Sequence, residues 1–184
     1  MSQSPNIWHF NPFDTQKRIG YSHNKHCRLV QDPEDWIVIT DGDACYLTSD
    51  YGNLIEEAAK SDFDIMGCLT NRIGVPHLAA EGKPSNNPDI GYHIDQAKTR
   101  KFDNDILETN LVSGFFLMFK KSTYDTIGGF PDNAIDFDIQ FCNKALELGF
   151  KIGVIQSIYM LHIYRWGKPL PQHYITHLIN GEII

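Results

Sequence analysis

Two carboxylates flank a glycine at Asp41-Gly42-Asp43, directly after the apolar run of residues 36–40. Such a β-branched run is typical of a buried strand, so the acidic residues should lie where a sheet edge opens into a crevice. Glycine allows a tight turn and leaves room for a bulky anion. Carboxylate oxygens suit Mg²⁺ and Mn²⁺, whose coordination is commonly completed by phosphates and water. The junction favours a metal-diphosphate site, although Asp-Gly alone also fits a hairpin turn.

Two more carboxylates, Asp136 and Asp138, open the clearest helical pattern in the chain, residues 136–148. Apolar residues such as Phe141 can line the buried side of this helix, which leaves Asp136 near its N-terminus with the carboxylate facing outward. Aspartate is also favoured there as a cap and by the helix dipole. A catalytic role therefore requires Asp136 to meet the first acidic pair across the crevice.

His162 lies near the end of a further predicted strand, residues 158–163. An imidazole beside two carboxylates would complete a mixed nitrogen and oxygen site that suits Mn²⁺ better than Ca²⁺. A single histidine at a strand end is also compatible with a purely structural role. The order of the motifs along the chain is needed to decide between the two.

The composition excludes several classes of partner. The chain has 184 residues, of which 42% are hydrophobic and 21% charged, and its formal charge is −7. An acidic protein of this kind does not offer a broad surface for a phosphate backbone, so nucleic acid is not expected as a partner. No apolar stretch approaches the roughly 20 residues of a transmembrane helix, and the polar start lacks the features of a signal peptide. We expect a cytoplasmic protein with a small or sugar-like substrate.

Hydrophobic periodicity and turn residues predict alternating helices and strands. Strands are expected at residues 36–40, 63–69, 111–119, 151–155 and 158–163, with an earlier one at 7–10, and helices at 14–30, 53–60, 122–127 and 136–148. Residues 71–92 are rich in Gly, Pro and Asn, and loops of that length are commonly lids or binding elements. The pattern indicates a single α/β domain over residues 1–184, with a mixed sheet flanked by helices.

The motifs occur in a specific order: the acidic pair, then Val112-Ser113-Gly114, Gly128-Gly129-Phe130, Asp136-Phe137-Asp138 and His162. This series resembles the GT-A nucleotide-sugar glycosyltransferases, most closely the inverting family 2 enzymes, over roughly residues 17–166. The resemblance implies a GT-A-like, Rossmann-like fold.

The resemblance also implies roles for individual residues. Asp43 would bind the metal-diphosphate of the donor directly, and Asp41 would contact the metal or the ribose. Asp136 would act as the catalytic base, with Asp138 as its support or as an alternative base. His162 would join the metal site. Outside these motifs, the guanidinium of Arg165 could contact a phosphate.

The chain also departs from the family pattern. It reaches its acidic pair by position 41, so most of the half that grips the nucleoside is missing, and Ile135 stands where an acidic residue commonly precedes the catalytic aspartate. Another chain could complete the pocket, and an incomplete sheet edge would favour a homo-oligomer.

Three functions remain open on the sequence. The first is a metal-dependent inverting glycosyltransferase that uses Mn²⁺ or Mg²⁺ and moves a sugar from a nucleoside-diphosphate donor to a saccharide or other hydroxyl acceptor. The donor expected for it is a UDP-sugar. The second is a non-catalytic or partner-dependent remnant that binds nucleotide and metal. The third is a glycoside hydrolase that uses paired carboxylates, since acid and base aspartates can lie at similar separations.

Overall fold

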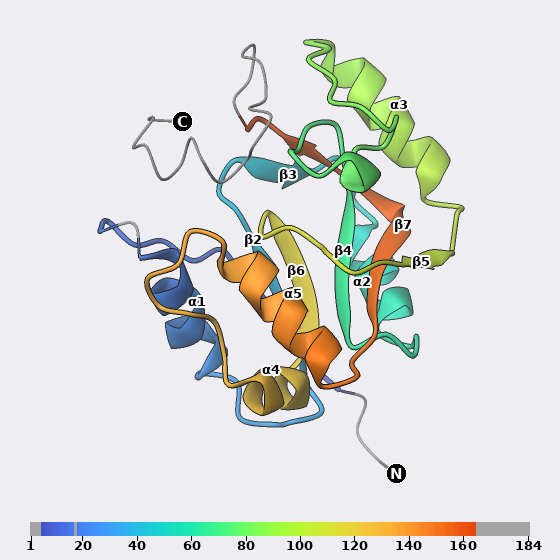
Figure 1. Cartoon of the computed structure of the whole chain (residues 1–184). Helices are drawn as coiled ribbons and strands as arrows, with labels where there is room; N and C mark the ends of the chain where they lie inside the picture. Colours follow the sequence, from blue (N-terminus) through green and yellow to red (C-terminus); the bar gives the residue numbers. More distant parts are fainter. Residues whose placement is uncertain (1–4, 17, 165–184) are drawn as a thin grey trace.

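A mixed sheet of seven strands forms the centre of the protein, which a computed structural model describes over residues 5–16 and 18–164 (Figure 1). The strands are β1 (Ile7–Phe10), β2 (Trp36–Thr40), β3 (Ala44–Tyr46), β4 (Ile65–Thr70), β5 (Ile106–Glu108), β6 (Phe116–Lys120) and β7 (Ile152–His162). Their order in the sheet is β1-β2-β6-β4-β7-β3, and β5 pairs with β7 outside this path. The predicted mixed α/β architecture is confirmed.

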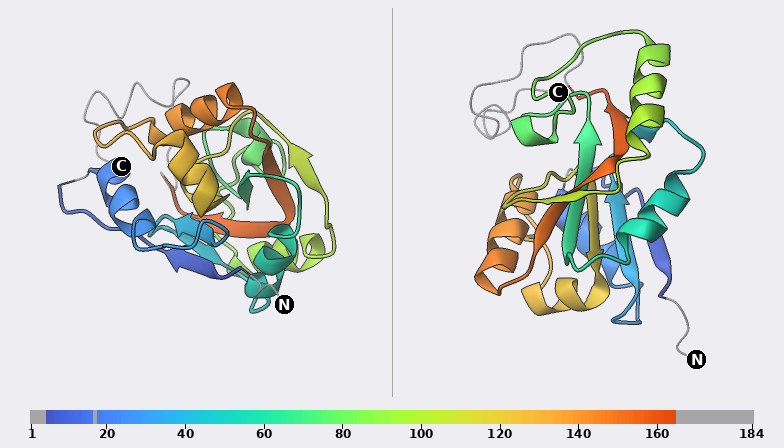
Figure 2. Two further views of the ribbon diagram at one scale, coloured as in Figure 1. Left: turned by 90° about the horizontal axis from the view of Figure 1, so that it is seen from below. Right: turned by 90° about the vertical axis from the view of Figure 1, so that its right-hand side faces the viewer.

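The helices cover both faces of the sheet. They are α1 (Ile19–Cys27), α2 (Tyr51–Ala58), α3 (Ile90–Arg100), α4 (Lys121–Ile127) and α5 (Phe137–Glu147), with a short 3₁₀ helix, η1 (Pro76–Leu78). Helices α4 and α5 lie on one face and α2 on the other, while α3 lies at the end of the sheet where β7 finishes (Figure 2). None of the helices in the described part of the chain combines the length and the apolar character needed to cross a membrane.

Strand β2 is an interior strand, as its unbroken apolar run predicts. All five of its residues are buried, and it pairs in parallel with β1 and antiparallel with β6. The buried carboxylate of Asp35, just before β2, accepts hydrogen bonds of 2.8 Å from the Asn6 backbone N–H and from Trp8 Nε1. These bonds fix β1 beside β2, so both strands end at the same edge.

Aromatic side chains fix α5 on the sheet. The ring of Phe141 lies 5.3 Å from that of Phe119 in β6 and 4.4 Å from that of Phe130, measured between centroids. Tilted and edge-to-face ring pairs at such distances add stability beyond the apolar area that they bury. As a result, the N-terminal end of α5 is directed toward the sheet edge where β2 ends (Figure 1).

Strand β7 is continuous, whereas the sequence predicted two separate strands. Its pairing with β4 shifts between Cys68, which faces Ile155, and Leu69, which faces Tyr159. The extra residues on β7 form an irregularity of the β-bulge kind, which bends a strand without ending it. The predicted break falls at this bulge, and β7 then continues to His162.

Other boundaries also differ from expectation. Helix α1 begins at Ile19 rather than near residue 14, because the Asp14 carboxylate accepts a 2.6 Å hydrogen bond from the Gln16 N–H and stabilises a turn. Helix α3 and the three-residue strands β3 and β5 were not predicted. The apolar stretch before Phe116 is buried but lies outside the strand β6.

Candidate metal and active site

The Asp41-Gly42-Asp43 segment forms a tight turn between β2 and β3. The Asp41 N–H donates to the Phe115 carbonyl at 3.0 Å, and the Ala44 N–H donates to the Asp41 carbonyl at 3.3 Å. Strand β3 begins at Ala44, which pairs with His162 in β7. The Ile163 N–H donates to the Asp43 carbonyl at 3.0 Å. Sheet pairing therefore brings the acidic turn next to the end of β7.

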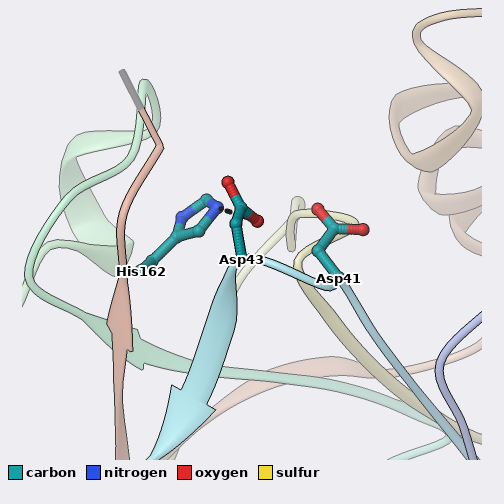
Figure 3. Close-up of side chains that lie close together, drawn as sticks. All are labelled: Asp41, Asp43 and His162. Atoms are coloured by element: carbon teal, nitrogen blue, oxygen red, sulfur yellow. Dashed lines mark ion pairs between the residues drawn. The ribbon is translucent and has the colours of Figure 1, made fainter. Parts of the chain in front are cut away.

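Three side chains predicted to bind metal meet at this point. Asp41, Asp43 and His162 each offer one ligand atom, and these atoms all lie within 4.8 Å of one another (Figure 3). The Nε2 atom of His162 is 3.3 Å from an Asp43 carboxylate oxygen. Asp41 and Asp43 are half-buried, whereas His162 is buried. Two oxygens and one nitrogen at this spacing can hold a divalent cation.

The surroundings of His162 determine which ring nitrogen faces the acidic pair. Its Nδ1 lies 3.0 Å from the Arg72 carbonyl oxygen, which can only accept, so Nδ1 carries a proton. The Asn71 side-chain oxygen accepts a 2.7 Å hydrogen bond from the His162 N–H, and Phe115 stacks on the ring at 5.0 Å between centroids. Metal-bound histidines are commonly oriented by such a bond on the second nitrogen.

This arrangement is suited to a cation at the centre of the site. The Nε2 lone pair and an Asp43 carboxylate oxygen face each other at 3.3 Å. A metal ion coordinated by both atoms would offset the repulsion between their lone pairs. The donor set therefore fits a divalent metal.

The two aspartates of the turn differ in proton affinity. Burial raises the pKa of Asp41 to about 7, and the charges of Asp43 and Asp138 act in the same direction, against an opposing effect of His162. Burial also tends to raise the pKa of Asp43, but the hydrogen bond and charge of His162 outweigh it and the pKa is lowered. Without metal, Asp41 holds a proton more readily than an ordinary aspartate.

This difference predicts opposite stability changes in two matched variants. Asp41 releases its proton near pH 4 in the unfolded chain, but only near pH 7 in the folded, metal-free protein. The folded state therefore loses stability as the pH rises from about 4 to about 7. In EDTA at about pH 8, Asp41→Asn should therefore raise the unfolding temperature. Asp43→Asn should lower it, because the lowered pKa of Asp43 contributes stability above about pH 4.

Thermal unfolding with EDTA and with Mn²⁺ checks this expectation. Added Mn²⁺ should stabilise the wild type and have little effect on Asp41→Asn, since a ligand that binds only the folded state raises its stability. If Asp41→Asn in EDTA were no more stable than the wild type at about pH 8, the raised pKa assigned to Asp41 would be wrong.

Asp138 and Asp136 occupy different positions at the start of α5. Asp138 is buried, and its carboxylate accepts hydrogen bonds of 2.9 Å from the Gly114 and Ile139 N–H groups. Burial raises the pKa of Asp138 despite these bonds. Asp136 is half-buried at the N-cap position, where its side chain makes no capping bond but accepts a 2.9 Å hydrogen bond from Gln140 Nε2.

The start of α5 is connected to the acidic turn through residues 113–115. The Gly114 N–H binds Asp138, and the Phe115 carbonyl binds the Asp41 N–H. A Cβ on Gly114 would lie 2.5 Å from the Phe137 ring, so glycine allows α5 to approach this segment. The negative charge of Asp138 also raises the pKa of Asp41. No direct contact between Asp136 and the metal-binding triad occurs among the interactions of the described residues.

Sequence reasoning missed part of the site. Asn71 and Arg72, which orient His162, were included in the predicted loop of residues 71–92. The signal that could have identified them is their position directly after the strand β4, where polar residues face the crevice. Gly42 is exposed at the tip of the turn. Arg165, a predicted phosphate contact, lies outside the described residues.

A pocket lies beside the end of β7. Its volume is about 370 Å³, and it is lined by Asn87, Pro88, Ile90, His93, Leu161 and Ile163. Leu161 and Ile163 are the neighbours of His162, and side chains alternate along a strand, so the pocket opens on the face of β7 opposite the imidazole. Residues 87–93, at the end of the predicted loop and the start of α3, thus contribute to a pocket close to the candidate site.

Comparisons with known proteins give matches at the level of structure only. No protein-family model matches the chain, and neither does any curated protein. The solved mannosyltransferase PcManGT from Pyrobaculum calidifontis, in complex with GDP-Man and Mn²⁺, matches with a TM-score of 0.50 and 18% identity over 84% of this chain and 37% of its own. GalNAc-T7 with UDP, GalNAc and Mn²⁺ matches with a TM-score of 0.52 and 10% identity over 77% of this chain and 29% of its own.

These identities are low, so the likeness concerns the fold. The chain spans 37% and 29% of the lengths of these two proteins. The chain therefore has the GT-A, Rossmann-like fold that is seen in these two proteins.

Proposed function

We propose that the protein is a metal-dependent glycosyltransferase that moves a sugar from a nucleoside-diphosphate donor to a hydroxyl acceptor. The observation that carries this proposal is the meeting of Asp41, Asp43 and His162 at the sheet edge of a GT-A fold. Structural neighbours with this fold were solved with Mn²⁺ and with GDP-Man or UDP, which supports a nucleotide-sugar donor.

The three side chains would hold Mn²⁺ or Mg²⁺. Both carboxylates are hard oxygen ligands, and the orientation of His162 presents Nε2 as the third donor. When bound, the ion supplies positive charge to the diphosphate that leaves the sugar. The tight turn at Gly42 keeps side-chain atoms away from that anion.

The acceptor is activated by a carboxylate in this proposal. We assign this role to Asp136, which is half-buried at the N-cap of α5, while Asp138 is buried and bound to backbone amides. Asp136 would remove the proton of the acceptor hydroxyl as its oxygen attacks the anomeric carbon. A single displacement of this kind inverts the configuration at that carbon. We further propose a UDP-sugar as donor and a saccharide or other hydroxyl compound as acceptor, with Arg165 as a phosphate contact.

The test is a panel of nucleotide sugars incubated with the protein, Mn²⁺ and candidate acceptor saccharides. We expect release of nucleoside diphosphate with one or a few donors, and loss of that release when EDTA is added. The configuration of the new glycosidic bond, read by NMR, should be opposite to that of the donor. Turnover that persists in EDTA would rule out the metal-dependent mechanism.

A second candidate is nucleotide and metal binding without turnover. It is favoured by the position of β1, which pairs only with β2 among the described strands and so leaves its other edge open. A partner chain or a second copy could add to such an edge. Calorimetry that detects binding of UDP and Mn²⁺ by a protein with no transferase activity would support this candidate instead.

A further inference from the structure

A buried asparagine connects α1 to the segment that precedes the proposed base. Asn24 is 4% exposed, and its side chain makes four hydrogen bonds to residues 124–132. Its Nδ2 donates to the Phe130 carbonyl at 2.7 Å and to an Asp132 carboxylate oxygen at 2.8 Å. Its Oδ1 accepts from the Phe130 N–H at 2.9 Å and from the Tyr124 hydroxyl at 2.8 Å.

These bonds use the full capacity of the amide. A primary amide has two donor protons and two acceptor lone pairs, and Asn24 uses all of them within one segment. Aspartate keeps the acceptors but lacks both donors, and leucine lacks all four. All four hydrogen bonds therefore require an amide side chain at position 24, and a polar side chain of another kind would not make them all.

The backbone of the segment is shaped to receive this contact. Gly128 and Gly129 have φ values of 92° and 85°, which favour glycine. A Cβ on Gly20 in α1 would lie 2.0 Å from the Pro131 carbonyl oxygen, so the helix and the segment are in direct backbone contact. Residues 128–132 are thus fixed against α1.

This segment determines where α5 begins. Only residues 133–135 separate it from Asp136. Phe130 packs on Phe137 and Phe141 at 5.6 Å and 4.4 Å between ring centroids, so a displacement of Phe130 would be transmitted to the first turns of α5. The opposite side of the helix start is fixed independently by the bond between Asp138 and the Gly114 N–H.

We propose that Asn24 is a positioning residue that fixes, through Phe130 and Asp132, where Asp136 presents its carboxylate to the acceptor. This inference rests on the proposed function for the role of Asp136, but the mechanical link itself does not. It assigns to α1, which supplies none of the three side chains of the candidate metal site, a part in the activation of the acceptor.

Exchange of the side chains at positions 24 and 132 tests the inference, beginning with position 24 alone. Asn24→Asp places a carboxylate against the Asp132 carboxylate and the Phe130 carbonyl, so residues 130–132 should move away from α1. We expect kcat for transfer to fall by about 10- to 100-fold, because a small misplacement of a catalytic group has effects of this size. The donor KM and the affinity for Mn²⁺ should stay unchanged, since Asn24 does not touch the metal site.

Restoring one of the two lost bonds should restore part of the rate. In the double variant Asn24→Asp with Asp132→Asn, the new amide can donate to the new carboxylate, so kcat should be higher than in Asn24→Asp alone, although it should stay below the wild type because the Phe130 carbonyl still faces a carboxylate. Asp132→Asn alone is the matched control, because it keeps an acceptor for Asn24. If Asn24→Asp lowers the unfolding temperature yet leaves kcat unchanged below that temperature, Asn24 is only structural and the inference is wrong.

Hydrogen exchange provides a readout that does not require turnover. The Gln140 N–H donates to the Asp136 carbonyl at 3.0 Å and reports on the first turn of α5. Its exchange should be faster in Asn24→Asp, and slower in the double variant than in Asn24→Asp alone. Unchanged exchange in Asn24→Asp would overturn the inference. A wild type without any transferase activity would refute the proposed function instead, while the exchange rates still decide whether Asn24 holds the start of α5.

Discussion

Replacement of Asp43 by alanine should lower the rate of sugar transfer about a thousandfold, because the loss of metal stabilisation at the leaving diphosphate is worth several kcal/mol. Asp43 is the carboxylate that faces His162 Nε2, at 3.3 Å. Its removal leaves His162 and Asp41, and burial raises the pKa of Asp41, so that this carboxylate binds a proton in competition with the metal more readily than an ordinary aspartate. Nucleoside-diphosphate release over a range of Mn²⁺ concentrations measures the effect.

Cys45→Ser is a suitable control for Asp43→Ala. Cys45 lies two residues after Asp43, in the short strand β3 that follows the acidic turn, and it is an exposed free cysteine. The control should retain wild-type turnover and Mn²⁺ affinity, while calorimetry should detect greatly weakened Mn²⁺ binding by Asp43→Ala. Wild-type turnover by Asp43→Ala would show that the acidic turn does not hold the catalytic metal.

Replacement of Asp136 by asparagine should have the second large effect, a loss of about 10²- to 10⁴-fold in kcat, which is the usual contribution of a general base. Asparagine is nearly isosteric and can still accept the hydrogen bond from Gln140 Nε2, so α5 should remain folded. Binding of UDP and Mn²⁺ should be unchanged, since Asp136 makes no contact with the metal-binding triad among the described residues. Single-turnover kinetics and calorimetry measure the two properties separately.

Asp138→Asn separates the two candidate bases. The Asp138 carboxylate accepts from the backbone N–H groups of Gly114 and Ile139, and asparagine has only one acceptor oxygen for these two donors. We therefore expect a lower unfolding temperature and a smaller loss of kcat than in Asp136→Asn. A larger loss of kcat in Asp138→Asn, without loss of stability, would transfer the role of base to Asp138.

The sequence predicted the interior of the sheet well. Residues 36–40 form β2 with the expected bounds, because a β-branched run buried on both faces has few alternatives to a strand. The early strand at residues 7–10 is also confirmed. In contrast, β3 and β5 contain three residues each and exist only through their pairing with β7. Local propensity does not predict strands that depend on a distant partner.

The candidate site was predictable to a similar degree. The order of the motifs predicted that Asp41, Asp43 and His162 would converge, and the structure brings the three together. Their roles as metal ligands, and those of Asp136 and Asp138 in catalysis, stay predictions. Sequence spacing could not rank the two aspartates, because a capping carboxylate and a catalytic one occupy the same positions at a helix start. The three-dimensional structure distinguishes them, because Asp138 is buried and its carboxylate accepts a hydrogen bond from the Gly114 N–H.

The position of β7 determines when the candidate site can form as the chain is synthesised. This strand lies between β4 on one side and β3 and β5 on the other, and it carries His162 at its far end. During synthesis the acidic turn is made before β7, the last of the described strands, which carries His162. The three side chains of the candidate site can therefore come together only after β7 has been inserted between β4 and β3.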